Sequence, residues 1–121
     1  MIAHDGKKVD VVAFATYNRA LLVGFDLIAT RSTGEVLRAK VGLDVESVAS
    51  GPQGCDAQIA ARVVDGDVDA VLFMVDPLDA HPHDPDIRTL LRICNVRNVP
   101  IATNIATADL LVTSSLLTAP D

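Results

Sequence analysis

Short apolar runs rich in β-branched residues alternate with longer amphipathic stretches along this chain, and this alternation limits the fold most strongly. The clearest runs span residues 25–30, 44–50, 69–75 and 99–104, and residues 1–3 add a fragment of a first run. Such runs are typical of strands, and the stretches between them are typical of helices. Successive parallel strands need a crossover of about a dozen residues or more, so the pattern favours a parallel sheet covered by helices on both faces. We therefore predict an α/β fold, a single three-layer domain over residues 1–121 with a parallel five-stranded sheet.

The amphipathic stretches predict where the helices lie. We expect helices over residues 7–18, 19–24, 34–41 and 56–65, another directly after the segment PHDPD at residues 82–86, and a last one beginning near Thr107. Gly66 is a candidate C-terminal cap for the fourth helix, since glycine tolerates the left-handed conformation. The side chains expected to face the core are Ile59, Ala60 and Val63, then Ile87, Leu90, Leu91 and Cys94, and finally Leu110 and Leu111.

Length and charge exclude several classes of protein. The 121 residues suit one domain with one site per chain. The 10 Lys and Arg residues stand against 16 Asp and Glu residues, for a formal net charge of -6, and no basic run occurs, so we expect no nucleic-acid partner. The longest apolar run, residues 70–75, is far shorter than the roughly 20 residues needed to cross a bilayer, so we expect no membrane span.

The start of the chain and its cysteines indicate a cytoplasmic protein. The sequence MIAHDGKK turns polar at His4, where a secretory signal would begin its apolar stretch. Cys55 and Cys94 form no metal-binding spacing, which suits a reducing compartment, and Cys94 is expected in the core.

Conspicuous polar chemistry follows nearly every predicted strand. The segments after the five runs read HDGK, TRSTG, SGPQGCD, DPLDAHPHDPD and NIATAD. In a parallel sheet the carboxyl ends of the strands share one edge, and ligands bind beyond that edge. The order of the sequence therefore predicts that these segments gather into one site.

The segment TRSTG has the character of an anion-binding loop. It offers the hydroxyls of Thr30, Ser32 and Thr33 at the start of a predicted helix, where backbone N–H groups and the helix dipole favour an anion. Lys8 adds a point charge from the segment after the first strand. Taken alone, the hydroxyls are equally explained as helix caps.

The segment SGPQGCD repeats the arrangement after the third strand. Ser50 and Gly51 let a ligand approach the backbone, and Asp56 stands where the next helix begins. A carboxylate at this point is also stabilised by the helix dipole without any ligand. Because two such loops are expected on one edge, ligand binding by each of them becomes a stronger hypothesis.

The segment HPHDPD at residues 81–86 allows three interpretations. Asp84 followed by Pro85 is good helix-capping chemistry and needs no site. A metal would use His81 and His83 with carboxylates, but no further His or Cys cluster completes a tetrahedral set, so we expect no metal. Proton transfer by a histidine of this segment, oriented by a carboxylate, is the better supported interpretation.

Together these motifs resemble the methylglyoxal synthase family in order and spacing. The resemblance covers almost the whole chain and is carried by AHDGKK, ATRSTG, SGPQGCDAQIAARV and DPLDAHPHDPDIRTLLRICNVRNVPIATNIATAD. It implies a fold with flavodoxin-like layering and the conversion of dihydroxyacetone phosphate to methylglyoxal and inorganic phosphate. It also implies a homohexamer that uses no metal or organic cofactor.

The resemblance assigns roles to individual residues. Asp56 matches the catalytic base, and His83 matches the histidine that handles protons on the substrate oxygens. Asp86 and Asp76 match supporting aspartates. The chain departs from the family pattern at Arg31 and Cys55, where small residues, commonly glycine, are usual. The expected substrate and phosphate contacts are His4, Asp5, Lys8, Thr30, Arg31, Ser32, Thr33, Ser50 and Gly51.

Two other functions fit parts of the sequence. A non-catalytic sensor domain of the same fold, like the one at the end of carbamoyl phosphate synthetases, would bind a small anion or nucleotide for regulation. Such a sensor has no need of both Asp56 and His83. A zinc-dependent hydrolase using HPHDPD is the third and weakest hypothesis.

Overall fold

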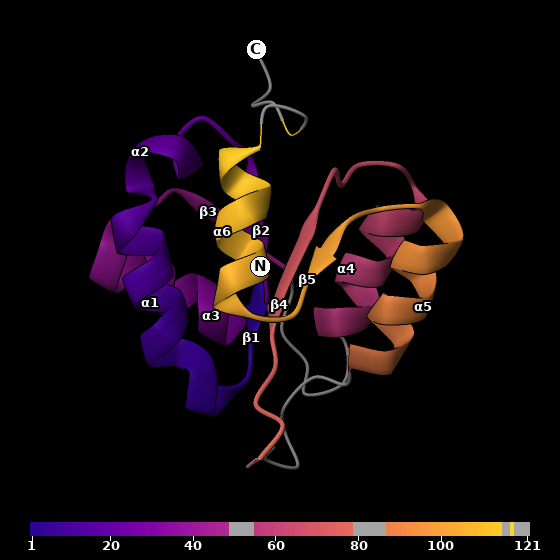
Figure 1. Ribbon diagram of the computed structural model, residues 1–121, viewed down its shortest axis with the longest axis horizontal. Helices are drawn as coiled ribbons and strands as arrows, with labels where there is room; N and C mark the ends of the chain where they lie inside the picture. The colour runs from indigo at the N-terminus through magenta and orange to yellow at the C-terminus, as the bar shows by residue number, and fades with distance from the viewer. Residues whose placement is uncertain (49–54, 79–86, 115–116, 118–121) are drawn as a thin grey trace.

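Five short parallel strands run through the middle of the described part of the molecule (Figure 1). The computed structural model describes residues 1–48, 55–78, 87–114 and 117, and only the backbone of Cys55 and Asp56. The strands are β1 (Ile2–Ala3), β2 (Leu27–Ala29), β3 (Val45–Ser47), β4 (Val71–Met74) and β5 (Ile101–Ala102). Each lies within one of the runs identified from the sequence.

The strands pair as two parallel sheets, which corrects the predicted single sheet of five strands. One sheet has the order β1-β4-β5, and the other pairs β2 with β3. Two hydrogen bonds join the start of the chain to β2 and to the helix that follows β2. The Met1 amine donates to the carbonyl of Ile28, and the backbone N–H of Ala3 donates to Thr33 Oγ1 over 3.1 Å. Because Ala3 gives its N–H to a side chain, β1 forms no ladder with β2.

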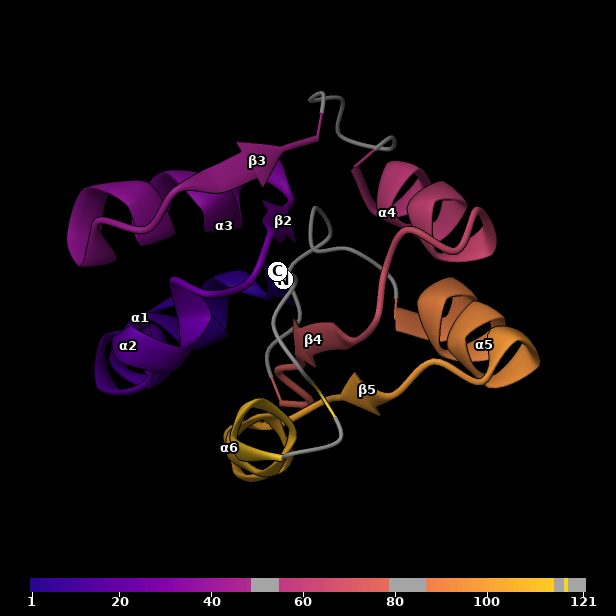
Figure 2. The same ribbon diagram turned by 90° about the horizontal axis from the view of Figure 1, so that it is seen from above.

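Helices cover both sides of the strands. A short 3-10 helix η1 (Asp5–Lys7) leads into α1 (Lys8–Tyr17), followed by α2 (Arg19–Leu22), α3 (Arg31–Val36) with its π-helical continuation η2 (Leu37–Val41), α4 (Cys55–Val64), α5 (Ile87–Arg97) and α6 (Ile105–Thr113). Seen from above, α4 and α5 lie on one side, and α1, α2, α3 and α6 lie on the other (Figure 2). Among the described residues, no helix is both long and apolar enough to span a bilayer.

Two helices begin earlier than their predicted starts. Helix α3 begins at Arg31 because Thr30 has the extended backbone of an N-cap, with φ of -63° and ψ of 158°. Gly34 lies inside that helix, where a side-chain Cβ would come within 2.6 Å of Ser47 Oγ. Helix α6 begins at Ile105, since Asn104 Oδ1 caps it by accepting the backbone N–H of Thr107 over 2.9 Å.

The end of α4 is as predicted. Gly66 adopts a φ of 82°, in the left-handed region that glycine enters without strain. Its backbone N–H donates to the carbonyl of Val63 over 3.1 Å, which closes the last turn.

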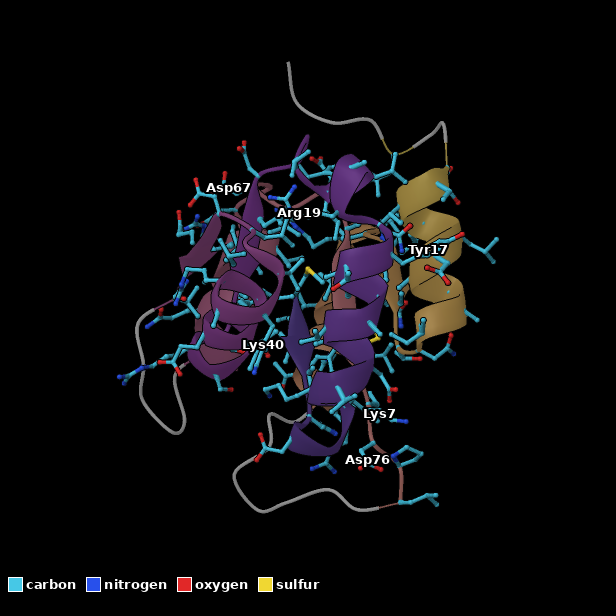
Figure 3. The ribbon with its side chains drawn as sticks, turned by 90° about the vertical axis from the view of Figure 1, so that its left-hand side faces the viewer. Lys7, Tyr17, Arg19, Lys40, Asp67 and Asp76 are labelled. Carbon is cyan, nitrogen blue, oxygen red and sulfur yellow. The ribbon has the colours of Figure 1, made fainter. Side chains whose placement is uncertain are left out.

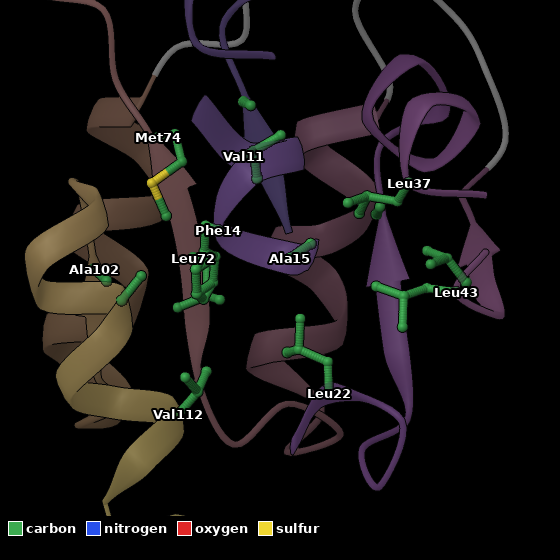
Figure 4. Close-up of a cluster of buried hydrophobic side chains, with 14 residues drawn as sticks. Val11, Phe14, Ala15, Leu22, Leu37, Leu43, Leu72, Met74, Ala102 and Val112 are labelled. Atoms are coloured by element: carbon green, nitrogen blue, oxygen red, sulfur yellow. The ribbon is translucent and has the colours of Figure 1, made fainter. Parts of the chain in front are cut away.

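Alternate side chains of β4 enter two separate cores, one on each side of the strands. Leu72 and Met74 pack with Val11 and Phe14 of α1 in the cluster shown in Figure 4. Val71 and Phe73 point the other way, into a cluster with side chains of α4 and α5. This alternation is the period of two that the pleat of a strand imposes. The strands therefore hold both helical layers at once.

Most of the predicted core side chains are buried, but two predictions are wrong. Leu91 is 39% exposed and Leu110 is 72% exposed. Helix α6 buries Ala108 and Val112 instead, four residues apart on one face. Burial raises the pKa of the Cys94 thiol, as expected of a core cysteine. The confirmed positions are Ile59, Ala60, Val63, Leu90 and Cys94, with Ile87 and Leu111 packed at the margins of the cores.

Replacing Thr33 by Val tests the contact between β1 and α3. Valine keeps the shape of this fully buried side chain but cannot accept the Ala3 N–H, which leaves a buried donor unpaired. We expect the free energy of unfolding, measured with urea, to fall by about 1–3 kcal/mol. Thr16→Val is the control, because the exposed Thr16 hydroxyl only donates to a carbonyl of its own helix, that of Val12. Equal small losses in both variants would contradict this role for Thr33.

Candidate active site

The loops that follow β1, β2 and β4 meet at one end of the molecule. The loop after β1 begins at His4, and the loop after β4 contains Asp76. Figure 3 places Lys7 and Asp76 at this end and Asp67 and Arg19 at the opposite end. We call this end, at the carboxyl ends of the strands, the carboxyl edge. It is the edge on which the order of the sequence placed the polar segments.

His4 is buried at this edge with a defined orientation. Its backbone N–H donates to the carbonyl of Met74, and its Nδ1 accepts the backbone N–H of Asp76, each over 3.0 Å. The imidazole stands edge-on to the ring of Phe73, with centroids 5.4 Å apart and an interplanar angle of 86°. Because Nδ1 is an acceptor here, the ring proton lies on Nε2. The ring of His4 is therefore fixed, with its donor proton on Nε2.

Gly6 makes room for the carboxylate of Asp76. A Cβ at residue 6 would lie only 2.1 Å from Asp76 Oδ2, and Asp76 Oδ1 accepts the backbone N–H of Leu78 over 3.1 Å. The carboxylate therefore packs directly on η1. His4 and Asp5 stand out in the sequence as titratable residues, whereas Gly6 was not predicted to belong to the site. A glycine directly after two titratable residues was the available signal for such a close approach.

Lys8 is held at the end of β1. Its Nζ donates to the carbonyl of Ala3 over 2.6 Å and lies 3.4 Å from Asp5 Oδ1. The side chain of Lys8 is only 16% exposed, whereas that of Asp5 is 62% exposed. The ammonium group is thus fixed at the carboxyl edge by a neutral carbonyl and only weakly countered by an exposed carboxylate.

The loop after β2 is tied to the same residue of β1. Thr33 Oγ1 accepts the backbone N–H of Ala3 over 3.1 Å and the hydroxyl of Thr30 over 3.2 Å. Both threonine side chains are buried. Since Ala3 also accepts from Lys8, the two loops lie side by side at this edge. In this arrangement Thr33 positions the loop, and the residues between the threonines face outward.

Those outward residues are Arg31 and Ser32, both exposed in the first turn of α3. Arg31 Nε lies 3.3 Å from Glu35 Oε1, one helical turn along. The cations near the edge therefore include Lys8, mostly buried against β1, and Arg31, on the surface of α3.

The remaining predicted site residues lie outside the described part of the structure. They are Ser50, Gly51, His81, His83, Asp84 and Asp86, together with the side chain of Asp56, whose backbone stands in the first turn of α4. The structure thus brings together His4, Asp5, Lys8, Thr30, Arg31, Ser32, Thr33 and Asp76, and it gives no geometry for the predicted base or for the predicted catalytic histidine.

The described part of the carboxyl edge holds several nitrogen-bearing side chains. They are the imidazole of His4, the ammonium group of Lys8 and the guanidinium group of Arg31 at the start of α3. Among the described residues, no group of three or more His, Cys, Asp or Glu side chains is arranged to hold a metal ion. The HPHDPD segment lies outside those residues.

A family model and a solved structure identify the class of protein to which this fold belongs. Residues 10–103 match the family model described as the MGS-like domain. The crystal structure of methylglyoxal synthase from Elizabethkingia anophelis NUHP1 superposes with a TM-score of 0.92 and 36% sequence identity, covering 99% of this chain and 83% of that one. The α/β architecture is therefore that of a known enzyme fold.

Sequence relatives place the chain within that class. It is 50% identical over its whole length to the methylglyoxal synthase of Ralstonia nicotianae, covering 90% of that protein. It is 49% identical over 93% of its length to a methylglyoxal synthase of Thermus thermophilus, covering 89% of it. An uncharacterized protein of Synechocystis, sll0036, is 54% identical over 93% of this chain, which spans only 26% of that longer relative. The chain belongs to the MGS-like family.

The orientation of His4 can be read directly by NMR. We expect two-bond 1H–15N correlation spectra to show the His4 ring proton on Nε2 and not on Nδ1, because Nδ1 accepts the Asp76 N–H. His4→Asn, which removes the ring, identifies the signal. A proton found on Nδ1 would contradict the geometry of this edge.

Proposed function

We propose that this protein, acting as one domain over residues 1–121, is a methylglyoxal synthase that converts dihydroxyacetone phosphate to methylglyoxal and inorganic phosphate. The observation that carries the proposal is the identity of 49–54% to proteins named methylglyoxal synthase, over 93–100% of the chain. The described carboxyl edge supports it, since its donors and cations suit a small phosphorylated substrate.

The reaction needs a base, a donor for the developing oxyanion and a holder for the leaving phosphate. In the proposal Asp56 removes a proton from the hydroxymethyl carbon beside the carbonyl, and the electron pair moves onto the carbonyl oxygen. His83, supported by Asp86, manages the protons on the two substrate oxygens. The enediolate then expels phosphate as the C–O bond breaks, and the resulting enol tautomerises to methylglyoxal. No metal or organic cofactor takes part.

The residues around β1 and α3 hold the substrate. His4 donates through Nε2 to a substrate oxygen, and Lys8 supplies charge from the end of β1. Arg31 and Ser32 surround the phosphate with guanidinium, hydroxyl and backbone donors, while the buried Thr30 and Thr33 hold that loop in position. Ser50, Gly51 and Asp5 complete the substrate contacts. Holding the phosphate fixed aligns the C–O bond for elimination.

The proposal includes a homo-oligomer, a hexamer by family resemblance, in the cytoplasm. The oligomer is supported by large apolar side chains exposed on α1 and α6, where Val9 is 81%, Tyr17 86% and Leu110 72% exposed. Figure 3 shows Tyr17 at the α1–α6 face. Monomeric proteins seldom expose grouped large apolar side chains, so contact between copies is the simplest explanation of this face.

Incubation with dihydroxyacetone phosphate tests the activity and the base together. We expect wild-type protein to release methylglyoxal and phosphate in equal amounts, with no loss on adding a chelator. Asp56→Asn cannot accept a proton, so it should lose both turnover and exchange of substrate protons with heavy water, by about 100- to 10,000-fold. His83→Asn should keep part of the exchange, because the base is still present.

Asp65→Asn is the matched control, since Asp65 is an exposed carboxylate just beyond the far end of α4. It should leave turnover and exchange unchanged. If folded wild-type protein produces neither product above the uncatalysed background, an anion-sensing domain replaces the enzyme. Near-normal turnover in folded Asp56→Asn would remove Asp56 from its role as the base.

A further inference from the structure

The stability of α3 does not explain why a positively charged residue, Arg31, stands at its start. It is the first residue of α3, and the helix dipole opposes a positive charge there. Its Nε lies 3.3 Å from Glu35 Oε1, with the two side chains 61% and 58% exposed. Ion pairs exposed to this degree contribute little, and an Arg preceding its carboxylate by four residues is the less favourable orientation. The pair therefore adds little to the stability of α3.

The surroundings of Arg31 lie on the proposed substrate edge. Its neighbour Thr30 is buried and hydrogen bonded to Thr33, which in turn accepts the N–H of Ala3. Ala3 also accepts from Lys8 Nζ over 2.6 Å. Two cations, Arg31 and Lys8, thus reach the same edge from α3 and from the end of β1. The Glu35 carboxylate that pairs with Arg31 is on the same helix, one turn further from the edge.

We propose that Glu35 sets the affinity of the substrate site by competing with the substrate phosphate for the guanidinium group of Arg31. The inference rests on the proposed function and extends it to a residue outside the substrate contacts. A guanidinium group binds phosphate through two parallel N–H bonds, and the Glu35 carboxylate offers it the same kind of partner. Binding of the phosphate must displace or share that carboxylate, so Glu35 lowers the affinity without touching the reacting carbon.

The proposal distinguishes Glu35 from the general negative charge of the chain. A net charge of -6 repels any anion, so removing any carboxylate weakly favours phosphate. A specific effect of Glu35 must exceed that background and must depend on Arg31. Glu46 is a suitable comparison, because it also pairs with an arginine, Arg62, at 2.8 Å, and is 57% exposed. Glu46 and Arg62 together line a hollow that the amino-terminal ends of β2 and β3 also border, away from the carboxyl edge.

The experiment measures the Kd for inorganic phosphate by calorimetry and the KM for dihydroxyacetone phosphate in the same set of variants. Glu35→Gln keeps the side-chain shape and should lower both constants by about two- to fivefold, with kcat within about twofold of wild type. Arg31→Ala should raise both constants by about tenfold. Glu46→Gln removes the same charge and should change neither constant beyond the small background effect.

The double variant Arg31→Ala with Glu35→Gln decides the mechanism. If Glu35 acts through Arg31, Glu35→Gln should have no further effect once Arg31 is absent. An equal gain in affinity in the Arg31→Ala background, or in Glu46→Gln, would overturn the proposal, since either result means that only overall charge matters. Circular dichroism spectra confirm that α3 is intact in each variant.

The two measurements also separate this inference from the proposed function. Wild-type turnover combined with unchanged constants in Glu35→Gln would reject the role of Glu35 and leave the enzyme standing. Absence of turnover in folded wild-type protein would reject the enzyme. In that case the phosphate Kd values still decide whether Glu35 competes for Arg31.

Discussion

Both backbone groups of Ala3, the last residue of β1, hold side chains that come from other elements. Its N–H donates to Thr33 Oγ1 of α3, and its carbonyl accepts from Lys8 Nζ of α1. These two bonds join the loop after β1 to the loop after β2 at a point where the strands themselves are not paired. The next residue, His4, extends the connection to β4 through Met74 and Asp76. The carboxyl edge is therefore built around the end of one very short strand.

This arrangement explains why a short strand can anchor a site. Ile2 and Ala3 are both buried and enter opposite cores, so β1 is fixed from both sides. Strand β4, which pairs with β1 in parallel, is also fixed from both sides. Leu72 and Met74 enter one core, and Val71 and Phe73 enter the other. Packing on both faces makes the position of His4 relative to Asp76 a property of the fold rather than of the loops. A substrate that binds here meets donors already in place, which limits the ordering cost of binding.

The sequence predicted the elements and the edge better than it predicted their contacts. Periodicity located the strands, and their order placed the polar loops together, because both are local or topological properties. The split of the strands into two sheets was not predictable, since it depends on Ala3 donating to Thr33 rather than to β2. The exposure of Leu110 was not predicted, because α6 carries apolar side chains on both faces and the sequence pattern therefore did not indicate which face points to the core.

Individual roles at the site were less predictable still. A glycine directly after His4 and Asp5 indicates a close approach, but its partner, Asp76, is far away in the sequence and could not be predicted. The buried role of Thr33 is likewise invisible in TRSTG, where its hydroxyl resembles those of Thr30 and Ser32. The assignments of Asp56 and His83 came from family resemblance, and they are still predictions.

A titration with inorganic phosphate, followed in 1H–15N NMR spectra, tests the central claim most directly. That claim is that the loops joined through Ala3 form one anion-binding edge. The account predicts that the amide signals of Asp5, Lys8, Ser32 and Asp76 shift together along a single saturation curve. The signals of Asp26, Asp44 and Asp69, at the opposite ends of the strands, should stay in place. Saturable shifts confined to that opposite end, with the Ala3 edge unmoved, would contradict it.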